Sequence, residues 1–299
     1  MNNLISIADL SKQNILDILA LAKQFKNGLK KRSLEGKVIA SCFFEASTRT
    51  RLSFESAILK LGGGVIGFAD SDSTSHGAKG ESLVDTLKVI NGYADALIIR
   101  HPLDGAARLA QSVCSIPVIN AGDGANQHPS QTLLDLFSIQ DSQNKIENIS
   151  IGLLGDLKHG RTIHSLVEAA KFFNIQLYFI APKELRMNEN KLFQLKTSGI
   201  QYSFHNSVDE VIHKLDCLYI IRIQKERFDE SISFDKYKLN LKSLQNVKSN
   251  FKILSPLPRL EELPVEIDAT PYAYYFQQAQ NGLYIRQALL DMILGDKLN

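Results

Sequence analysis

Five consecutive residues, Ser47 to Arg51 (STRTR), place hydroxyl and guanidinium groups side by side. An apolar run typical of a buried strand precedes them near 37–44, and an amphipathic helix near 51–61 follows. The first turn of a helix has free backbone N–H groups and the positive end of the helix dipole. Arg49 and Arg51 add charge, and arginine can hold a phosphate with two parallel hydrogen bonds. The segment predicts a phosphate site; a plain helix cap with solvated arginines is the alternative for the bare motif.

A second candidate is the segment from Gly155 to Thr162 (GDLKHGRT), which also follows an apolar run and precedes a helix. Its spacing is that of a P-loop, with Arg161 in the place of the usual lysine. A P-loop-like nucleotide-binding enzyme is therefore the alternative function, although no later strand ends in an obvious magnesium-binding aspartate. His159 and His164 are five residues apart, which does not suit two metal ligands on one helix face, so we expect surface or hydrogen-bonding histidines and no zinc site.

The elements that must position these residues alternate between strands and helices. Ser11 is the predicted N-cap of an amphipathic helix, after which strands and helices alternate to residue 120. A helix then begins at HPSQTLLDLFSIQ, and five more apolar runs follow: ISIGLLGD, QLYFIAP, QYSFH, CLYIIRI and FKILS. This repeated alternation predicts an α/β protein with two doubly wound parallel-sheet domains, and the polar stretch at 141–148 is the predicted seam.

Polar clusters follow the apolar runs, where open α/β sheets bind their ligands. Five of six such clusters contain arginine. The six clusters are 47–51, 100–102, 126–129, 156–162, 222–227 and 255–259. His128 with Pro129 would in isolation be a plain helix start, but its place among these clusters favours a binding role.

The composition limits the classes of protein that remain. A chain of 299 residues with 44% hydrophobic and 22% charged residues is typical of a globular protein with two domains. The chain has 34 basic and 32 acidic residues, so it has no overall positive charge of the size that would favour binding of nucleic acid. Cys42, Cys114 and Cys217 are odd in number and far apart, which favours reduced thiols and a cytoplasmic location. We expect no export signal and no membrane span, because no apolar run approaches about 18 residues.

Taken together, the motifs closely resemble catalytic chains of the aspartate/ornithine carbamoyltransferase family over nearly the whole sequence. The matching segments are FFEASTRTRLSFESA, STSHGAKGE, IIRHP, GDGANQHPSQTLLDLF, GDLKHGRTIHSL, RIQKER, PLPR and TPYAYYFQQAQNGLYIRQALL. RIQKER and PLPR resemble the aspartate branch, whereas the ornithine branch has an H-C-L-P motif where this chain reads SPLP. Ser255 departs from the family's usual histidine before P-L-P-R; backbone carbonyls make the main contacts there, so we expect activity to survive.

The resemblance implies transfer of a carbamoyl group from carbamoyl phosphate to L-aspartate, an early step of pyrimidine synthesis, with no cofactor. It assigns carbamoyl phosphate to Ser47, Thr48, Arg49, Thr50, Arg100, His128 and Gln131, with Ser75 and Lys79 supplied by a neighbouring subunit of a homotrimer. It assigns aspartate to Lys79, Arg161, Arg222 and Gln224, and contacts with the substrate amines to the carbonyls of Pro256 and Leu257. About four substrate charges would thus meet five cations: Arg49, Lys79, Arg100, Arg161 and Arg222.

The catalytic assignment implied by the resemblance is Arg49, Thr50, Lys79, Arg100 and His128. The carbamoyl-phosphate domain would be residues 1–132 with the C-terminal helix near 284–299, and the aspartate domain 133–283, joined by interdomain helices. Positioning and charge stabilisation would then be the main tasks of the protein. The sequence leaves open whether regulatory chains bind.

Overall fold

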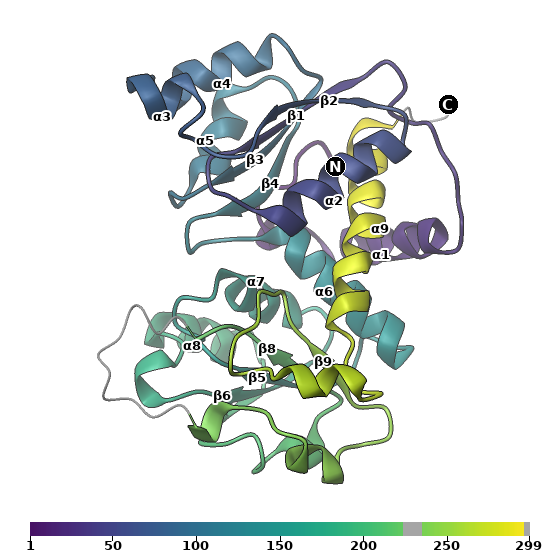
Figure 1. Cartoon of the computed structure of the whole chain (residues 1–299), viewed down its shortest axis with the longest axis vertical. Helices are drawn as coiled ribbons and strands as arrows, with labels where there is room; N and C mark the ends of the chain where they lie inside the picture. Colours follow the sequence, from purple (N-terminus) through teal and green to yellow (C-terminus); the bar gives the residue numbers. More distant parts are fainter. Residues whose placement is uncertain (224–234, 296–299) are drawn as a thin grey trace. The chain divides into compact units, whose positions relative to one another are not determined.

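The structure, a computed structural model, describes residues 1–223 and 235–295 and consists of two compact units (Figure 1). The first unit contains Met1–Phe137 and Gln280–Asn299, and the second contains Ser138–Ala279. Helices α6 (Pro129–Gln143) and α9 (Tyr275–Leu294) have residues in both units. The prediction of an α/β protein with two doubly wound parallel-sheet domains is confirmed.

The first unit is built on a sheet of four parallel strands in the order β2-β1-β3-β4 (Figure 1). Its strands are β1 (Val38–Phe43), β2 (Gly64–Phe68), β3 (Ala96–His101) and β4 (Val118–Asp123). Its helices, besides the short η1 (Ile7–Asp9), are α1 (Lys12–Lys26), α2 (Thr48–Lys60), α3 (Ser75–Lys79), α4 (Leu83–Asn91) and α5 (Ala106–Val113). Helix α2 starts three residues earlier than the sequence predicts, directly after Ser47.

Alternation along β1 explains why this sheet is covered on both faces. Ala40 and Cys42 belong to the same buried cluster as Leu87 of α4 and Ala110 of α5. Ser41 points to the other face, because successive side chains of a strand alternate, and its hydroxyl donates to Glu55 of α2 at 3.1 Å. The β1 sequence thus accepts helices on both faces, which is what a doubly wound sheet requires.

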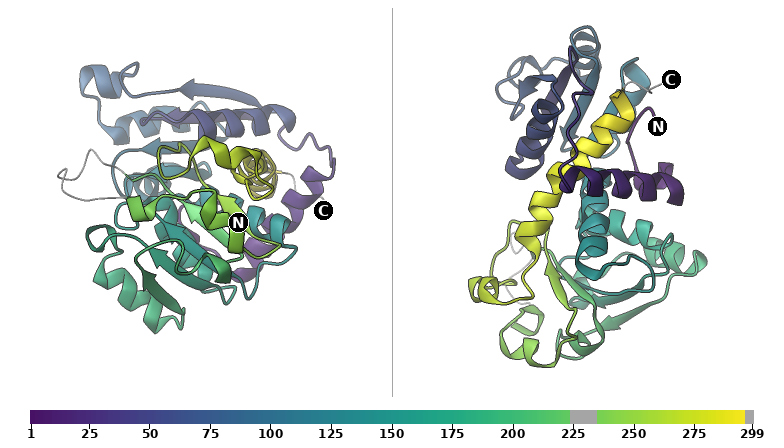
Figure 2. Two further views of the ribbon diagram at one scale, coloured as in Figure 1. Left: turned by 60° about the horizontal axis from the view of Figure 1, so that its bottom comes forward. Right: turned by 90° about the vertical axis from the view of Figure 1, so that its right-hand side faces the viewer.

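Both ends of the chain contribute to the first unit. Helix α1 begins with the predicted Ser11 cap, which forms a capping box with Asn14. Helix α1 and the segment after it lie beside the C-terminal part of α9 (Figures 1 and 2). Lys31 donates to Asp291 at 2.7 Å. The C-terminal helix is therefore part of the scaffold of the first unit.

The second unit has a five-stranded parallel sheet in the order β7-β6-β5-β8-β9. Its strands are β5 (Ser150–Leu154), β6 (Gln176–Ile180), β7 (Tyr202–His205), β8 (Cys217–Ile220) and β9 (Lys252–Leu254). Its helices are α7 (Arg161–Ala170), α8 (Glu189–Thr197) and the short η2 (Lys183–Leu185), η3 (Ile212–Lys214), η5 (Asp235–Tyr237), η6 (Lys242–Asn246) and η7 (Val265–Ala269). Leu154, Ile180 and Leu218 are among the buried side chains of its core, against which Tyr275 also packs.

No helix within residues 1–223 and 235–295 is long and apolar enough to cross a membrane.

Candidate functional site

In the first unit, the predicted phosphate residues lie at the point where the strand order reverses. Strands β1 and β3 are neighbours, although the chain passes through β2 between them. Residues 47–50 follow β1, and Arg100 is the penultimate residue of β3, where it pairs with Phe43 of β1. Open α/β sheets bind ligands at such a switch point, beyond the carboxyl ends of the strands. The fold therefore brings these two sequence-predicted groups together.

The start of α2 differs from the other serine-led helices of this unit. Ser11 and Ser82 each accept a hydrogen bond from a backbone N–H of the helix they precede, whereas Ser47 makes no side-chain cap. The first N–H groups of a helix have no partner within the helix, so an uncapped start favours binding of an anion. Arg49 is exposed, and partial desolvation lowers the pKa of its guanidinium. A bound anion would oppose that effect, because it favours the charged form. The simple capping alternative does not fit this geometry.

The Arg100 side chain is positioned by the end of β3 and by two oxygen atoms that it contacts. The β3–β4 register shifts between Ile99 and His101, a bulge that re-aims the intervening side chain. The Arg100 guanidinium contacts Glu45 at 3.0 Å and the carbonyl of Ala121 at 3.5 Å. Glu45 was missed by the sequence reasoning, although it lies two residues before the phosphate motif.

Arg51 has a structural role that the sequence did not predict. Its guanidinium pairs with Glu55, one turn later on α2, at 2.7 Å. Glu55 also accepts from Ser41 of β1, so this ion pair ties α2 to the sheet. This pairing gives Arg51 a role in the scaffold, and a contribution of its charge to the phosphate site stays a prediction.

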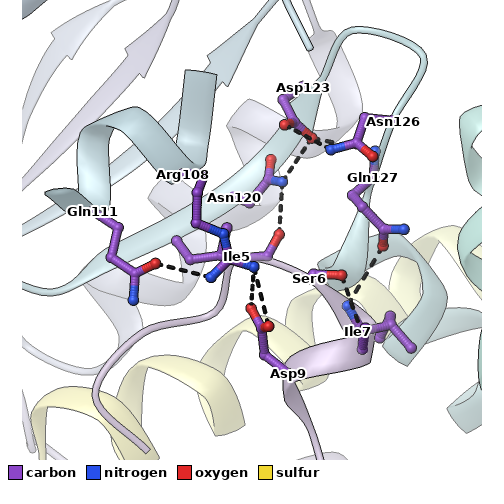
Figure 3. A network of polar contacts seen from close by, with 11 residues as sticks. Ile5, Ser6, Ile7, Asp9, Arg108, Gln111, Asn120, Asp123, Asn126 and Gln127 are labelled. Carbon is purple, nitrogen blue, oxygen red and sulfur yellow. Dashed lines mark hydrogen bonds and ion pairs between the residues drawn. The ribbon is translucent and has the colours of Figure 1, made fainter. Parts of the chain in front are cut away.

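His128 ends the loop that follows β4, and Gln131 lies in the first turn of α6. Both side chains are buried, at 4% and 8% exposure. The Asp123 carboxylate accepts from the Gln127 backbone at 3.2 Å and from the Asn126 side chain at 3.2 Å (Figure 3).

The N-terminal segment closes the same network (Figure 3). Asn120 donates both to Asp123 at 2.9 Å and to the carbonyl of Ile5 at 2.9 Å, and the Ile7 backbone donates to Gln127 at 3.5 Å. This segment therefore supports the loop that delivers His128.

Ser75 and Lys79 are placed on the surface of the first unit. Both are exposed, on α3, which packs against α4 and, through His76, against Phe44 with ring centroids 5.3 Å apart. Thr74 caps this short helix by accepting from Gly77. The lysine thus projects from an ordered turn.

The second unit has a matching reversal of strand order. β5 and β8 are neighbours, while the chain passes through β6 and β7 between them. Arg161 begins the helix after β5, and Arg222 follows β8 by two residues. Pro256 and Leu257 follow β9, the next strand in the sheet. The fold therefore places Arg161 and Arg222 after neighbouring strands of one sheet, whereas Lys79 lies on α3 of the first unit and Gln224 lies outside the described residues.

The loop before Arg161 already contains an anionic group. Asp156 is fully buried, and its carboxylate accepts from the backbone N–H groups of Lys158 at 3.1 Å and His159 at 3.0 Å. Its second oxygen lies 3.1 Å from Nδ1 of His159. A P-loop needs those N–H groups for phosphate, so the P-loop alternative does not fit this geometry. His164 is also engaged, with its Nε2 3.1 Å from the Leu157 carbonyl, as expected for a hydrogen-bonding histidine.

Gly155 is required at this switch point. Its φ is +121°, and a Cβ there would lie 2.1 Å from the carbonyl oxygen of Ile221. The ends of β5 and β8 approach each other so closely that only glycine fits. This approach brings the segments that carry Arg161 and Arg222 together.

The segment after β9 is held in place by polar side chains. The hydroxyl of Ser255 accepts from the Leu257 backbone at 3.2 Å, and the Ser255 backbone donates to Gln278 at 2.7 Å. Arg259 donates to Asp268 at 2.7 Å and to the Tyr275 hydroxyl at 3.1 Å. Ser255, which replaces the family's histidine, is thus a structural residue that shapes the Pro256–Leu257 turn.

Within the described parts of the chain, no group of three or more histidine, cysteine or acidic side chains is arranged to hold a metal ion. Burial raises the pKa of the Cys42 and Cys217 thiols to about 12, so both are inert at neutral pH.

Each of the two parallel sheets has arginines at its switch point, an arrangement that suits a protein with two anionic ligands. The chain belongs to the aspartate/ornithine carbamoyltransferase family: its carbamoyl-P binding domain matches residues 2–141 and its Asp/Orn binding domain matches residues 147–293.

Named relatives agree with this membership. The chain is 52% identical, over 98% of its length and 95% of the relative's, to the aspartate carbamoyltransferase catalytic subunit 2 of Shewanella halifaxensis. It also resembles the catalytic subunit of M. jannaschii aspartate transcarbamoylase (44% identity, 98% of both chains, TM-score 0.91). A third relative is Trypanosoma cruzi aspartate transcarbamoylase in complex with N-(phosphonacetyl)-L-aspartic acid (34% identity, 98% and 96% of the chains, TM-score 0.91).

Proposed function

We infer that this chain is an aspartate carbamoyltransferase, which converts carbamoyl phosphate and L-aspartate to N-carbamoyl-L-aspartate and phosphate for pyrimidine synthesis. The observation that carries this inference is the start of α2, which has no side-chain cap and follows β1, the strand that pairs with β3 at Arg100. This arrangement suits an anion, and the similar aspartate carbamoyltransferase of Shewanella halifaxensis matches 98% of the chain. The similar aspartate transcarbamoylase of Trypanosoma cruzi has been solved in complex with carbamoyl phosphate and aspartate.

The first unit would bind carbamoyl phosphate. The backbone of residues 47–50 and Arg49 would hold the phosphate. The donors to the carbonyl oxygen, as it gains charge in the transition state, would be Arg49, Thr50, Arg100 and His128. Such donors act on a developing oxyanion more strongly than on the ground-state carbonyl, which lowers the barrier.

The second unit would bind aspartate through Arg161, Arg222 and Gln224, with one carboxylate for each arginine in the simplest arrangement. The carbonyls of Pro256 and Leu257 would accept from the substrate amines. Two observations support this assignment. Strands β5, β8 and β9 are neighbours in the sheet, and residues 147–293 match the Asp/Orn binding domain of the family. The amine attacks the carbamoyl carbon, and the departing phosphate accepts the amine proton.

A homotrimer with shared active sites is part of the proposal, with Ser75 and Lys79 supplied to a neighbour's site. The exposure of Lys79 on an ordered turn supports this role. Mixing Arg49→Ala and Lys79→Ala chains tests it, because about one interface in four would pair intact partners in a randomly assembled ring. Recovery of about a quarter of wild-type activity is expected, whereas no recovery above the separate variants would exclude sharing. The three unpaired cysteines support a cytoplasmic location.

The activity itself is tested by measuring N-carbamoyl-L-aspartate formed from the two substrates in the presence of a chelator. We expect full activity with the chelator and none with ornithine in place of aspartate. Turnover that requires magnesium and ATP, or that prefers ornithine, would overturn the proposal.

A further inference from the structure

A buried arginine lies where three helices of the first unit meet. Arg286 of α9 is 2% exposed, and its guanidinium carbon is 4.8 Å from the ring centroid of Phe54 of α2. A Cβ on Gly282, one turn earlier on α9, would lie 2.3 Å from a guanidinium nitrogen, so the helix has glycine where the side chain needs room. Burial lowers the pKa of Arg286 to about 9, and the nearby Asp135 carboxylate of α6 opposes that effect. The guanidinium therefore stays charged at neutral pH.

Asp135 connects this charge to the carbamoyl-phosphate residues. It is fully buried, and it accepts a hydrogen bond from Nε2 of Gln131, one turn earlier on α6, at 2.8 Å. An ionised carboxylate can only accept hydrogen bonds, so the amide of Gln131 must turn its NH2 group toward Asp135. Its carbonyl oxygen is then directed away from Asp135.

The charge on Arg286 matters for this orientation. A neutral aspartic acid can also donate, in which case the Gln131 amide could turn over. A positive charge close by favours an ionised carboxylate over a neutral one. The Asp135 carboxylate, with the buried Arg286 guanidinium near it, therefore selects one of the two amide orientations.

We propose that Asp135 and Arg286 are positioning residues that set the Gln131 amide with its oxygen toward the carbamoyl NH2 group, and so select carbamoyl phosphate over acyl phosphates without that group. The proposal rests on the proposed function. An amide oxygen accepts a hydrogen bond from NH2 but gains nothing from a methyl group, so acetyl phosphate should lose this interaction.

The test compares three ligands on the Asp135→Asn enzyme: carbamoyl phosphate, acetyl phosphate and inorganic phosphate. We expect the dissociation constant of carbamoyl phosphate to rise about tenfold, which equals about 1.4 kcal/mol, while those of the other two change less than threefold. The KM for carbamoyl phosphate should rise with a smaller change in kcat. Asp216→Asn is the matched control, because Asp216 is also buried and ion-paired, with Lys248 at 2.9 Å in the second unit. It should leave the selectivity unchanged.

Asp135→Asn alone leaves Arg286 without its counter-charge and can unfold the chain. The double variant Asp135→Asn, Arg286→Met removes both charges together and should show the same loss of selectivity. Unchanged selectivity in a folded variant, or equal weakening of all three ligands, would overturn the positioning role. A wild-type enzyme that makes no carbamoyl aspartate would instead overturn the proposed function, so the two failures are distinguishable.

Discussion

Both units place arginines at the switch point of a parallel sheet. They differ in whether a side chain of the chain itself accepts from the backbone N–H groups that follow the first strand of that switch point. After β1, Ser47 leaves the start of α2 without a side-chain cap. After β5, the Asp156 carboxylate takes the N–H groups of Lys158 and His159. A phosphate can therefore use backbone donors in the first unit, whereas the second unit must rely mainly on arginine side chains. Equivalent positions in similar folds can thus bind different anions because one buried carboxylate is present or absent.

The largest expected effect is that of Arg49→Ala, which removes a donor to both phosphate and the developing charge. We expect kcat to fall by about 10²-fold or more while the chain stays folded. Steady-state assay of carbamoyl aspartate measures this effect. Arg51→Ala is the matched control on the same helix turn, because its partner is Glu55. Near-normal turnover of Arg49→Ala would remove the phosphate assignment of the first unit.

Arg222→Ala tests the second unit and its proposed role in binding aspartate. Loss of a charged hydrogen bond to a carboxylate typically costs about 1.5–3 kcal/mol, so the KM for aspartate should rise roughly tenfold to a hundredfold. Carbamoyl phosphate should bind with little change when measured directly by calorimetry. Equal weakening of both substrates would contradict the division of labour between the units.

Asp156→Ala tests the loop difference itself. It leaves two backbone N–H groups without their acceptor, so the free energy of unfolding should fall by about 2–3 kcal/mol in urea titrations. The KM for aspartate should rise about tenfold, because the segment that leads to Arg161 loses its internal support. The exposed Asp209→Ala is the control in the same unit. Unaltered stability and aspartate affinity would show that the carboxylate does not organise the loop.

Ser255→Ala should have the smallest effect. It removes one neutral hydrogen bond to the Leu257 backbone, worth about 1 kcal/mol, so kcat/KM for aspartate should fall by less than about tenfold. Ser255→Thr keeps the hydroxyl and should restore most of the loss. A threonine variant as impaired as the alanine variant would mean that the hydroxyl does not hold this turn.

Local patterns in the sequence were enough to predict the fold class and to propose much of the candidate site. Apolar runs of strand length alternate with amphipathic helices, and the Ser11 cap follows from the residue types alone. The phosphate motif and the arginines after the strands were recognisable because catalytic residues of open sheets cluster at strand ends. Asp135, four residues after Gln131 on one helix face, also carried a local signal that was overlooked.

Other features were decided only by the tertiary structure. The sequence cannot distinguish Arg49 from Arg51, because the pairing of Arg51 with Glu55 and Ser41 depends on how α2 lies on the sheet. Nor can it indicate that Arg286, about 150 residues from Asp135 along the chain, supplies the counter-charge for that carboxylate. Local propensity and periodicity determine elements and their ends, whereas burial and long-range proximity determine which charges are free to meet a substrate.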